Sequence, residues 1–300
     1  MLNRILSETH GKRFAVIVNE FGEVGIDNDL IVDADEEIFT MNNGCICCTV
    51  RGDLVRIIAG LMRRSRSFDG ILVETTGLAD PAPVAQTFFV DEDLRRKTKL
   101  DAIITVTDAK HLLGQIDQAP EAQEQLAFAD AVLVNKIDLV AAGTLAAVER
   151  RIRSINPYAK IHRTERCCID LSNVLGRDAF CLERILEIEP GFLNEEHEHE
   201  HEDRIGSLSL IADRPLKPNR FVSWIQDVTQ CYGTNILRMK GIASIEDEDR
   251  QFVVQSVHML IEGGSRRPWK EQEPRQTRIV FIGRDLPKDL LRQGFEACCA

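Results

Sequence analysis

Four short apolar runs in the first half of the chain constrain its fold more than any other feature. They are continuous and rich in β-branched residues, and they cover residues 14–18, 70–73, 102–106 and 131–134. Such runs are typical of strands that are buried on both faces of a sheet. Helical patterns separate them, and examples cover residues 54–62 and 145–155. The alternation predicts an α/β domain with a mostly parallel sheet and flanking helices.

The sequence changes character near residue 190. Residues 195–203 alternate glutamate and histidine, and such a charged run cannot build a core. We therefore predict an α/β domain over residues 1–190, an acidic histidine-rich linker over 191–204 and a small α+β domain over 205–300. In the last region the pattern predicts four strands, a helix that begins near Pro218 and a final helix. The predicted strands cover residues 205–211, 236–243, 251–257 and 277–282.

Polar motifs follow the apolar runs, and the carboxyl ends of parallel strands share one rim where ligands bind. The run 131–134 is followed by Asn135-Lys136-Ile137-Asp138. The carboxylate of Asp138 can accept the two N–H donors of guanine, while Asn135 reads the other edge and the Lys136 stem packs over the base. The alternative is an ordinary helix N-terminus with a surface lysine. We interpret the motif as a site for a guanine nucleotide, GTP.

A second motif, Glu74-Thr75-Thr76-Gly77, ends another of these runs. Glu74 can hold a water bound to Mg²⁺, and Gly77 lets its backbone N–H approach a terminal phosphate. We therefore assign Glu74 and Gly77 to the catalytic rim. The alternative is a polar strand end followed by a turn glycine.

Three of the nine cysteines lie within four residues, at Cys45, Cys47 and Cys48, next to Gly44. Their sulfurs can converge on one soft ion, most simply Zn²⁺, although Co²⁺ and copper(I) also suit three thiolates. Our candidate for the fourth ligand is Glu23. The alternative is a set of inert buried cysteines, but flanking asparagines and a glycine do not suit a core strand.

The predicted linker carries three further candidate metal ligands, His197, His199 and His201. A flexible histidine run binds metal weakly and exchanges it fast, which suits collection of the ion. An ordinary solvated acidic linker is the alternative interpretation.

Charge and hydropathy indicate which classes of partner the chain can bind and in which cellular compartment it works. The net charge of −11 argues against a nucleic-acid partner held by phosphate contacts. No stretch approaches the roughly 20 apolar residues of a membrane helix, and the first residues lack a secretory apolar core. We expect a cytoplasmic protein without a membrane partner, in which the cysteines are reduced and the cluster of Cys45, Cys47 and Cys48 supplies the ligands.

Together these motifs resemble the CobW family of metal-chaperone GTPases. The resemblance runs through residues 18–27, 43–48, 74–81 and 135–138, then through the histidine-rich linker to residues 280–284. It implies that GTP hydrolysis releases a metal from the Cys-x-Cys-Cys motif to a metalloprotein client. Zinc is the commonest assignment in this family, and cobalt delivery for cobalamin biosynthesis is a variant. The oligomeric state, a homodimer included, stays open.

The chain departs from this family in one respect. It contains no Gly-x-x-x-x-Gly-Lys-Thr loop, and residues 1–6 match the helix that follows that loop in the family. We therefore expect the first strand and the P-loop to be absent, a hole in the core of the sheet, weak GTP binding and essentially no hydrolysis. A metal-binding remnant that does not hydrolyse GTP is one alternative function, and a nickel-insertion GTPase is another.

Overall fold

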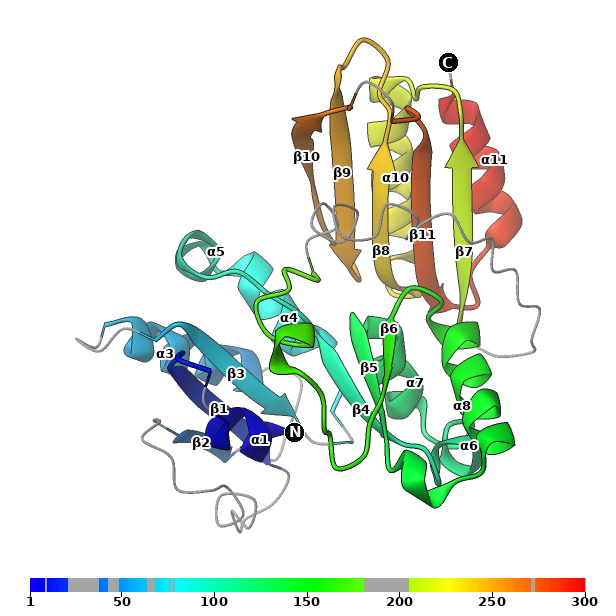
Figure 1. Ribbon diagram of the computed structural model, residues 1–300. Coiled ribbons are helices and arrows are strands. Elements are labelled where there is room, and N and C mark those ends of the chain that lie inside the picture. Colours follow the sequence, from blue (N-terminus) through cyan, green and yellow to red (C-terminus); the bar gives the residue numbers. More distant parts are fainter. Residues whose placement is uncertain are drawn as a thin grey trace.

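The structure is a computed structural model, and it describes residues 1–8, 10–20, 38–42, 49–63, 68–75, 77, 79–180, 205–270 and 273–299. Figure 1 shows parallel strands with helices around them in the first part of the chain, and an upright antiparallel sheet packed against them in the second part. Within the described residues, none of the helices combines the length and the apolar character needed to cross a membrane.

Six parallel strands of the first part form two three-stranded sheets, in the orders β2-β1-β3 and β4-β5-β6. The strands are β1 (Phe14–Glu20), β2 (Ile38–Asn42), β3 (Gly70–Thr75), β4 (Ile104–Asp108), β5 (Ala131–Asn135) and β6 (Lys160–Arg163). Four of them coincide with the four apolar runs. The predicted α/β architecture with parallel strands is therefore confirmed.

Helices connect these strands and cover their faces. They are α1 (Leu2–Ser7), α3 (Thr49–Met62), α4 (Ala82–Val90), α5 (Glu92–Lys97), α6 (Leu112–Gln115), α7 (Pro120–Phe128) and α8 (Ala142–Ile155). Local chemistry fixes where several of them begin. The Asp91 side chain accepts a hydrogen bond from the Leu94 N–H and so caps α5, and prolines occupy the first turns of α4 and α7.

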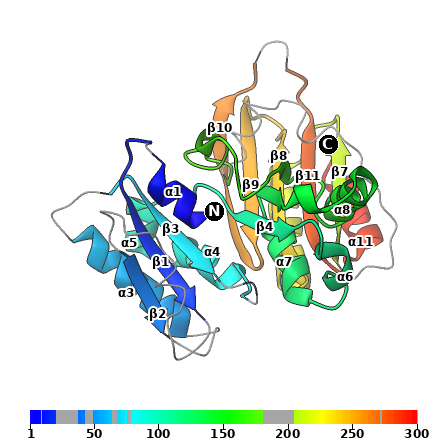
Figure 2. The same cartoon turned by 60° about the horizontal axis from the view of Figure 1, so that its bottom comes forward.

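The two parallel sheets meet at β3 and β4, which are not hydrogen-bonded to each other within the described residues. Ile5 of α1 packs in a cluster that Leu72 of β3 and Ile104 of β4 both contact. On the opposite face, α4 contributes Ala85 to one core cluster and Phe88 to the neighbouring one. Helices α1 and α4 therefore cover the junction from its two faces (Figure 2), and the facing edges of β3 and β4 are left without a described strand partner.

The second part of the chain is an antiparallel sheet of five strands in the order β10-β9-β8-β11-β7. Its elements are β7 (Ile205–Ala212), α10 (Pro218–Tyr232), β8 (Ile236–Ala243), β9 (Arg250–Val257), β10 (Leu260–Pro268), β11 (Thr277–Arg284) and α11 (Lys288–Cys298). Phe221 of α10 and Phe295 of α11 pack with Phe281 of β11 on one face. The predicted α+β character of this region is confirmed.

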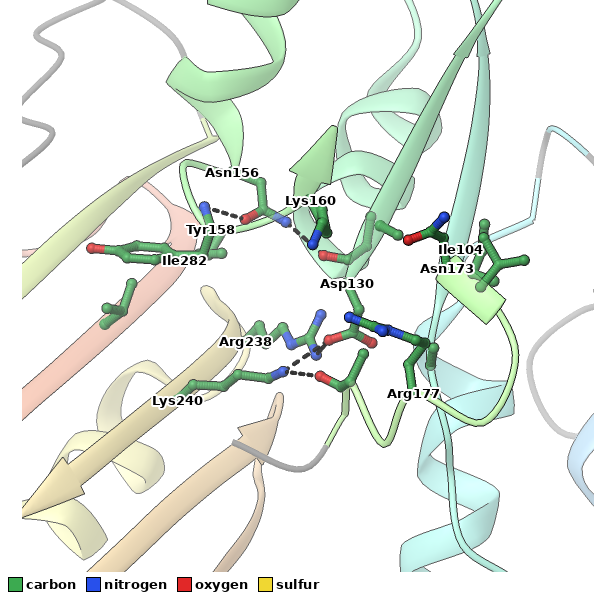
Figure 3. Close-up of a pocket in the computed structure, with 16 residues that line it drawn as sticks. Ile104, Asp130, Asn156, Tyr158, Lys160, Asn173, Arg177, Arg238, Lys240 and Ile282 are labelled. Carbon is green, nitrogen blue, oxygen red and sulfur yellow. Dashed lines mark hydrogen bonds and ion pairs between the residues drawn. The ribbon is translucent and has the colours of Figure 1, made fainter. Parts of the chain in front are cut away.

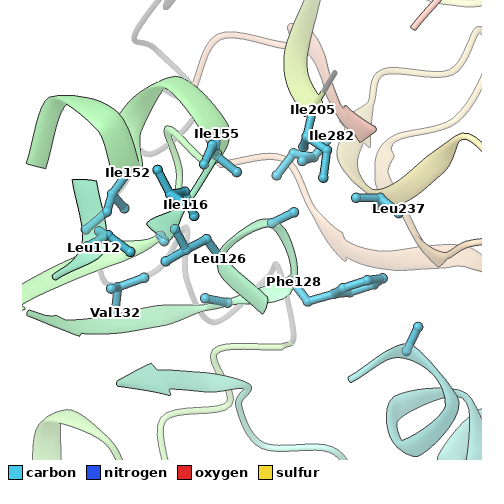
Figure 4. Packing of buried hydrophobic residues seen from close by; sticks show 14 of the residues in the cluster. Leu112, Ile116, Leu126, Phe128, Val132, Ile152, Ile155, Ile205, Leu237 and Ile282 are labelled. Carbon is cyan, nitrogen blue, oxygen red and sulfur yellow. The ribbon is translucent and has the colours of Figure 1, made fainter. Parts of the chain in front are cut away.

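The opposite face of the antiparallel sheet packs on the first part of the chain. Leu237 of β8 and Ile282 of β11 belong to the same buried cluster as Leu126 and Phe128 of α7 (Figure 4). Because Phe128 is fully buried, the two parts share a continuous apolar core. A shared core of this kind resists the relative motion that is otherwise expected between domains.

Three strands were not predicted, namely β2, β6 and β10. Strand β6 has the sequence Lys160-Ile161-His162-Arg163, and β10 contains two glycines and two arginines. Strands β6 and β10 lie at the edges of their sheets, where polar side chains reach solvent. An edge strand does not need a continuous apolar run, so the search for such runs could not find them.

Candidate guanine-nucleotide site

The polar motifs predicted from the sequence lie at the carboxyl ends of parallel strands. Asp108 ends β4 and lies directly opposite Asn135, which ends β5. Glu74 lies near the end of β3, where it is level with Val18 of β1. Because neighbouring strands in each sheet are parallel, each sheet presents its strand-end side chains along one edge.

The side chain of Asn135 is held in one orientation by the loop that follows β6. Its Oδ1 accepts hydrogen bonds from the Thr164 hydroxyl at 3.1 Å and from the backbone N–H of Cys167 at 2.8 Å. The amide NH₂ group of Asn135 is left as a donor, and N7 and O6 on one edge of guanine are acceptors. The loop therefore orients Asn135 to donate to that edge of the base.

Lys136 has a left-handed backbone, with φ of 62°, and this conformation turns the chain sharply from β5 into the short 3₁₀ helix Ile137–Leu139. Its Nζ lies 2.7 Å from Oδ2 of Asp108. His111 Nδ1 lies 3.0 Å from the same oxygen, and the Lys110 N–H donates to Oδ1 of Asp108. Asp108 therefore holds the lysine at the rim, next to the side chain that ends β5.

The contacts of Asp108 shift its pKa. Desolvation by burial raises the pKa, but hydrogen bonds from Lys136, His111 and the Lys110 backbone outweigh it and hold the pKa well below its usual range. The same contact raises the pKa of Lys136. Both groups are therefore charged at neutral pH, and a nucleotide base must pack beside an intact ion pair.

Asp138 lies in the 3₁₀ helix with its side chain exposed. It makes no hydrogen bond or ion pair with any described residue, so both carboxylate oxygens are available. The ring N–H and the exocyclic amine of guanine form a donor pair that fits such a carboxylate. The charge and the exposure of Asp138 thus match the role predicted for it.

Glu74 and Gly77 lie at the end of β3. Glu74 is exposed, and a Cβ added to Gly77 would meet no atom within 4 Å, so the backbone there is open to a ligand. Gln125 of α7 donates to the carbonyl oxygens of Gly77 and Ala79, at 3.1 and 2.9 Å. Helix α7 therefore positions the segment whose N–H groups were predicted to approach a phosphate.

The predicted metal ligands Glu23, Cys45, Cys47, Cys48, His197, His199 and His201 lie outside the described residues. The three cysteines fall, in chain order, between the end of β2 at Asn42 and the start of α3 at Thr49. The described residues themselves contain no group of three or more His, Cys, Asp or Glu side chains that could hold a metal ion.

The sequence pattern places Asp108 on the same rim as Asn135, because both follow apolar runs, but it gives no role to Thr164, Cys167 or Gln125. Thr164 and Cys167 follow a strand that the apolar pattern does not reveal, and Gln125 lies inside a helix. These residues reach the site only through the fold, so no local motif marks them.

The chain was compared with protein families and with individual proteins, and both of its parts match a known family. Residues 1–163 match the sequence profile described as "CobW/HypB/UreG, nucleotide-binding domain", and residues 205–299 match "Cobalamin synthesis protein cobW C-terminal domain". The chain is similar to the zinc chaperone YjiA of Escherichia coli, with 33% identity across 98% of this chain and 92% of the relative.

A second relative and a solved structure show the same similarity. The zinc-regulated GTPase metalloprotein activator 1 of Schizosaccharomyces pombe is 37% identical, and the match covers 95% of this chain and 79% of that protein. The crystal structure of the Zn(II)-bound YjiA GTPase from E. coli superposes with a TM-score of 0.80 and 28% identity, and the match covers 100% of this chain and 94% of that one. The resemblance therefore extends over both parts of the fold.

Proposed function

The chain belongs to the CobW/HypB/UreG family, and from this premise we propose that it is a GTP-dependent zinc chaperone. In this proposal it carries Zn²⁺ on the Cys-x-Cys-Cys motif and passes the ion to a metalloprotein client in the cytoplasm. The names of the relatives support a link between zinc, GTP hydrolysis and a metalloprotein.

The observation that carries the proposal is the pair of side chains at the end of β5. Asn135 is oriented by Thr164 and Cys167, and Asp138 keeps an exposed carboxylate without a described partner. The amide NH₂ of Asn135, at the end of β5, can donate to N7 and O6 of guanine. The two carboxylate oxygens of Asp138, in the 3₁₀ helix that follows, can accept from the opposite edge of the base. A site that hydrogen-bonds specific donors strongly rejects a base that lacks them.

Hydrolysis is assigned to the end of β3. There Glu74 would hold a water of the Mg²⁺ that accompanies GTP, and the Gly77 N–H would contact the terminal phosphate. The open space around Gly77 and the two hydrogen bonds from Gln125 support a preorganised phosphate contact. These 300 residues contain no Gly-x-x-x-x-Gly-Lys-Thr loop. We therefore expect them to bind GTP weakly and to hydrolyse essentially none on their own.

Zinc is the cargo in this account. Cys45, Cys47 and Cys48 supply three thiolates, Glu23 is the candidate fourth ligand, and His197, His199 and His201 would collect the ion and pass it on. Strands β1, β2 and β3 are parallel neighbours, and the cysteines follow β2 in the chain. The metal-binding and phosphate-binding segments therefore start from one edge of one sheet, which provides a route for coupling.

The test of guanine recognition uses a chimaera that carries a strand and a Gly-x-x-x-x-Gly-Lys-Thr loop ahead of Met1. The parent chimaera should prefer GTP to xanthosine triphosphate. Asp138→Asn replaces an acceptor pair by an amide that can donate to the extra carbonyl of xanthine, so the preference should reverse. Asp227→Asn changes an exposed aspartate of α10 and should leave the preference as it is. An unchanged preference in the Asp138 variant would remove Asp138 from the base site.

One alternative gives the whole function to the cysteine cluster, Cys45, Cys47 and Cys48. In this alternative the chain is a zinc-binding module without GTPase activity. It then binds zinc tightly, and GTP with Mg²⁺ leaves the zinc affinity of the chimaera unchanged. A preference for cobalt over zinc would be detected by titrating the chain with each ion and comparing the two affinities.

A further inference from the structure

A cavity lies between the two parts of the chain, at the amino ends of β4 and β5. Counting its opening to solvent, it encloses about 820 Å³, of which about 70 Å³ can hold the centre of a water molecule. Figure 3 shows side chains from β5, β6, the loop before residue 180 and β8 around it. Asn135 lies at the other end of β5, roughly 13 Å along the strand, so this cavity is separate from the candidate nucleotide site.

The charges in this cavity are unbalanced. Among the residues that the structure describes, four cationic side chains and one carboxylate, that of Asp130, line the cavity. The cationic residues are Lys160, Arg177, Arg238 and Lys240. Two nearby carboxylates are already engaged, because Asp101 accepts backbone N–H bonds from Gly176 and Asp178, and Asp178 pairs with Lys99. Lys160 and Lys240 have further contacts among the described residues, so the attraction for an anion comes mainly from Arg177 and Arg238.

The single carboxylate is fully committed. Oδ1 of Asp130 accepts hydrogen bonds from both Arg238 and Lys240, and Oδ2 accepts one from the Ile103 N–H. The side chain of Asp130 is only 2% exposed, and that of Arg238 only 4%. One buried anion thus faces two buried cations, and both cations also lie over the ring of Phe180, at 4.9 Å for Arg238 and 5.4 Å for Lys240.

Two of the cations also have unused donors. Nε of Arg238 is buried and has no hydrogen-bond acceptor among the described residues. Arg177 makes no hydrogen bond or ion pair within that same set of residues, and in Figure 3 it reaches toward Asp130 from the opposite wall. A buried N–H without an acceptor destabilises the fold, so an oxyanion here would relieve a penalty that the protein carries.

The remaining walls are apolar, and they include Ile104, Val174, Val280 and Ile282. An inorganic ion would leave these surfaces in contact with water. We propose that the cavity binds a small organic anion, with a phosphate or carboxylate group between Arg177 and the Arg238–Lys240 pair and an apolar body against these walls. Such a ligand contacts both domains and lies at the opposite end of β5 from the nucleotide rim, which gives it the position of an effector.

The experiment titrates the 300-residue chain with four probes by isothermal calorimetry at low ionic strength. Phenyl phosphate and benzoate carry both chemical parts, inorganic phosphate carries only the charge, and phenol carries only the ring. At least one of the first two should bind at least tenfold more tightly than either of the last two. If phenyl phosphate binds more tightly than benzoate, the anionic group of the ligand is a phosphate. If benzoate binds more tightly, it is a carboxylate.

The matched variants change one arginine each. Arg177→Ala should weaken the binding of the better probe at least tenfold, while Arg177→Lys, which keeps the charge, should lose less. Arg250→Ala removes an exposed arginine outside the cavity and should change nothing. Circular dichroism checks that each variant is folded. The proposal is overturned if neither organic anion binds saturably, if inorganic phosphate binds as tightly, or if folded Arg177→Ala binds like the parent.

Discussion

The change Asp130→Ala tests how the two parts of the chain are joined. Asp130 precedes β5, and its carboxylate receives hydrogen bonds from Arg238 and Lys240 of β8. Arg238 also donates to the Phe128 carbonyl, and Lys240 to the Ala179 carbonyl. The substitution removes the only carboxylate of this network and leaves two cations behind, both in side chains that are at most 10% exposed.

The expected cost follows from burial. Removing one partner of a buried ion pair costs about 3–5 kcal/mol, because the other charge stays buried without compensation. The chain supplies a control in Asp117, which pairs with Arg151 at 2.6 Å but has a side chain that is 68% exposed. An exposed pair contributes about 0–1 kcal/mol, so Asp117→Ala should be nearly silent.

Urea unfolding at neutral pH measures the difference. Far-UV circular dichroism follows the whole chain, and tryptophan fluorescence follows the second domain, which contains both tryptophans. In the parent the two signals should change together, because the domains share a core. In Asp130→Ala the midpoint should fall and the two signals should separate. A loss below about 1 kcal/mol, equal to that of Asp117→Ala, would refute the reasoning.

Further predictions concern the rim and the strands behind it. Since the pKa of Asp108 is lower in the folded chain than the unfolded value of about 3.9, its contacts stabilise the fold above that pH, and this contribution is lost as the pH falls. Acid titration of Asp108→Asn should therefore show a weaker loss of stability below pH 4 than the parent. Asn135→Ala leaves the Cys167 N–H without its acceptor and should cost about 1–3 kcal/mol in urea unfolding. Gly77→Ala should unfold like the parent but slow GTP hydrolysis in the chimaera, because a Cβ meets no protein atom there yet crowds the phosphate. Gly241→Ala places a Cβ 2.7 Å from Ile279 Cγ1 and should lower stability by about 1–3 kcal/mol.

The sequence was sufficient for the fold class and for four of its parallel strands. Strands β1 and β5 are buried and need apolar side chains on both faces, which is visible in any short window. Strands β3 and β4 carry similar apolar runs, although each has one edge without a described strand partner. Strands β6 and β10 lie at sheet edges, and their stability comes from pairing with one neighbour. Pairing depends on residues far away in the chain, so local composition does not reveal it.

The site residues likewise fall into two groups, those that a local motif reveals and those that only the fold brings together. Asn135 and Asp138 form part of a contiguous motif, and their chemistry was readable before the structure. The orientation of Asn135 by Thr164 and Cys167 joins segments 29 and 32 residues apart. The buried network between Asp130 and Arg238 spans 108 residues, and a charged residue in an alternating strand looks like one that faces solvent. Such contacts are products of the tertiary fold.

Coupling between zinc and the guanine nucleotide tests the central claim most directly. The measurement is the zinc dissociation constant of the chimaera, with and without GTP and Mg²⁺, with Cys45, Cys47 and Cys48 replaced by serine as the control that should lose the tight site. The account predicts that nucleotide changes zinc affinity by about 5–150-fold, and that zinc changes nucleotide affinity by the same factor. Equal zinc affinities with and without nucleotide, in a chimaera that binds both ligands, would contradict it.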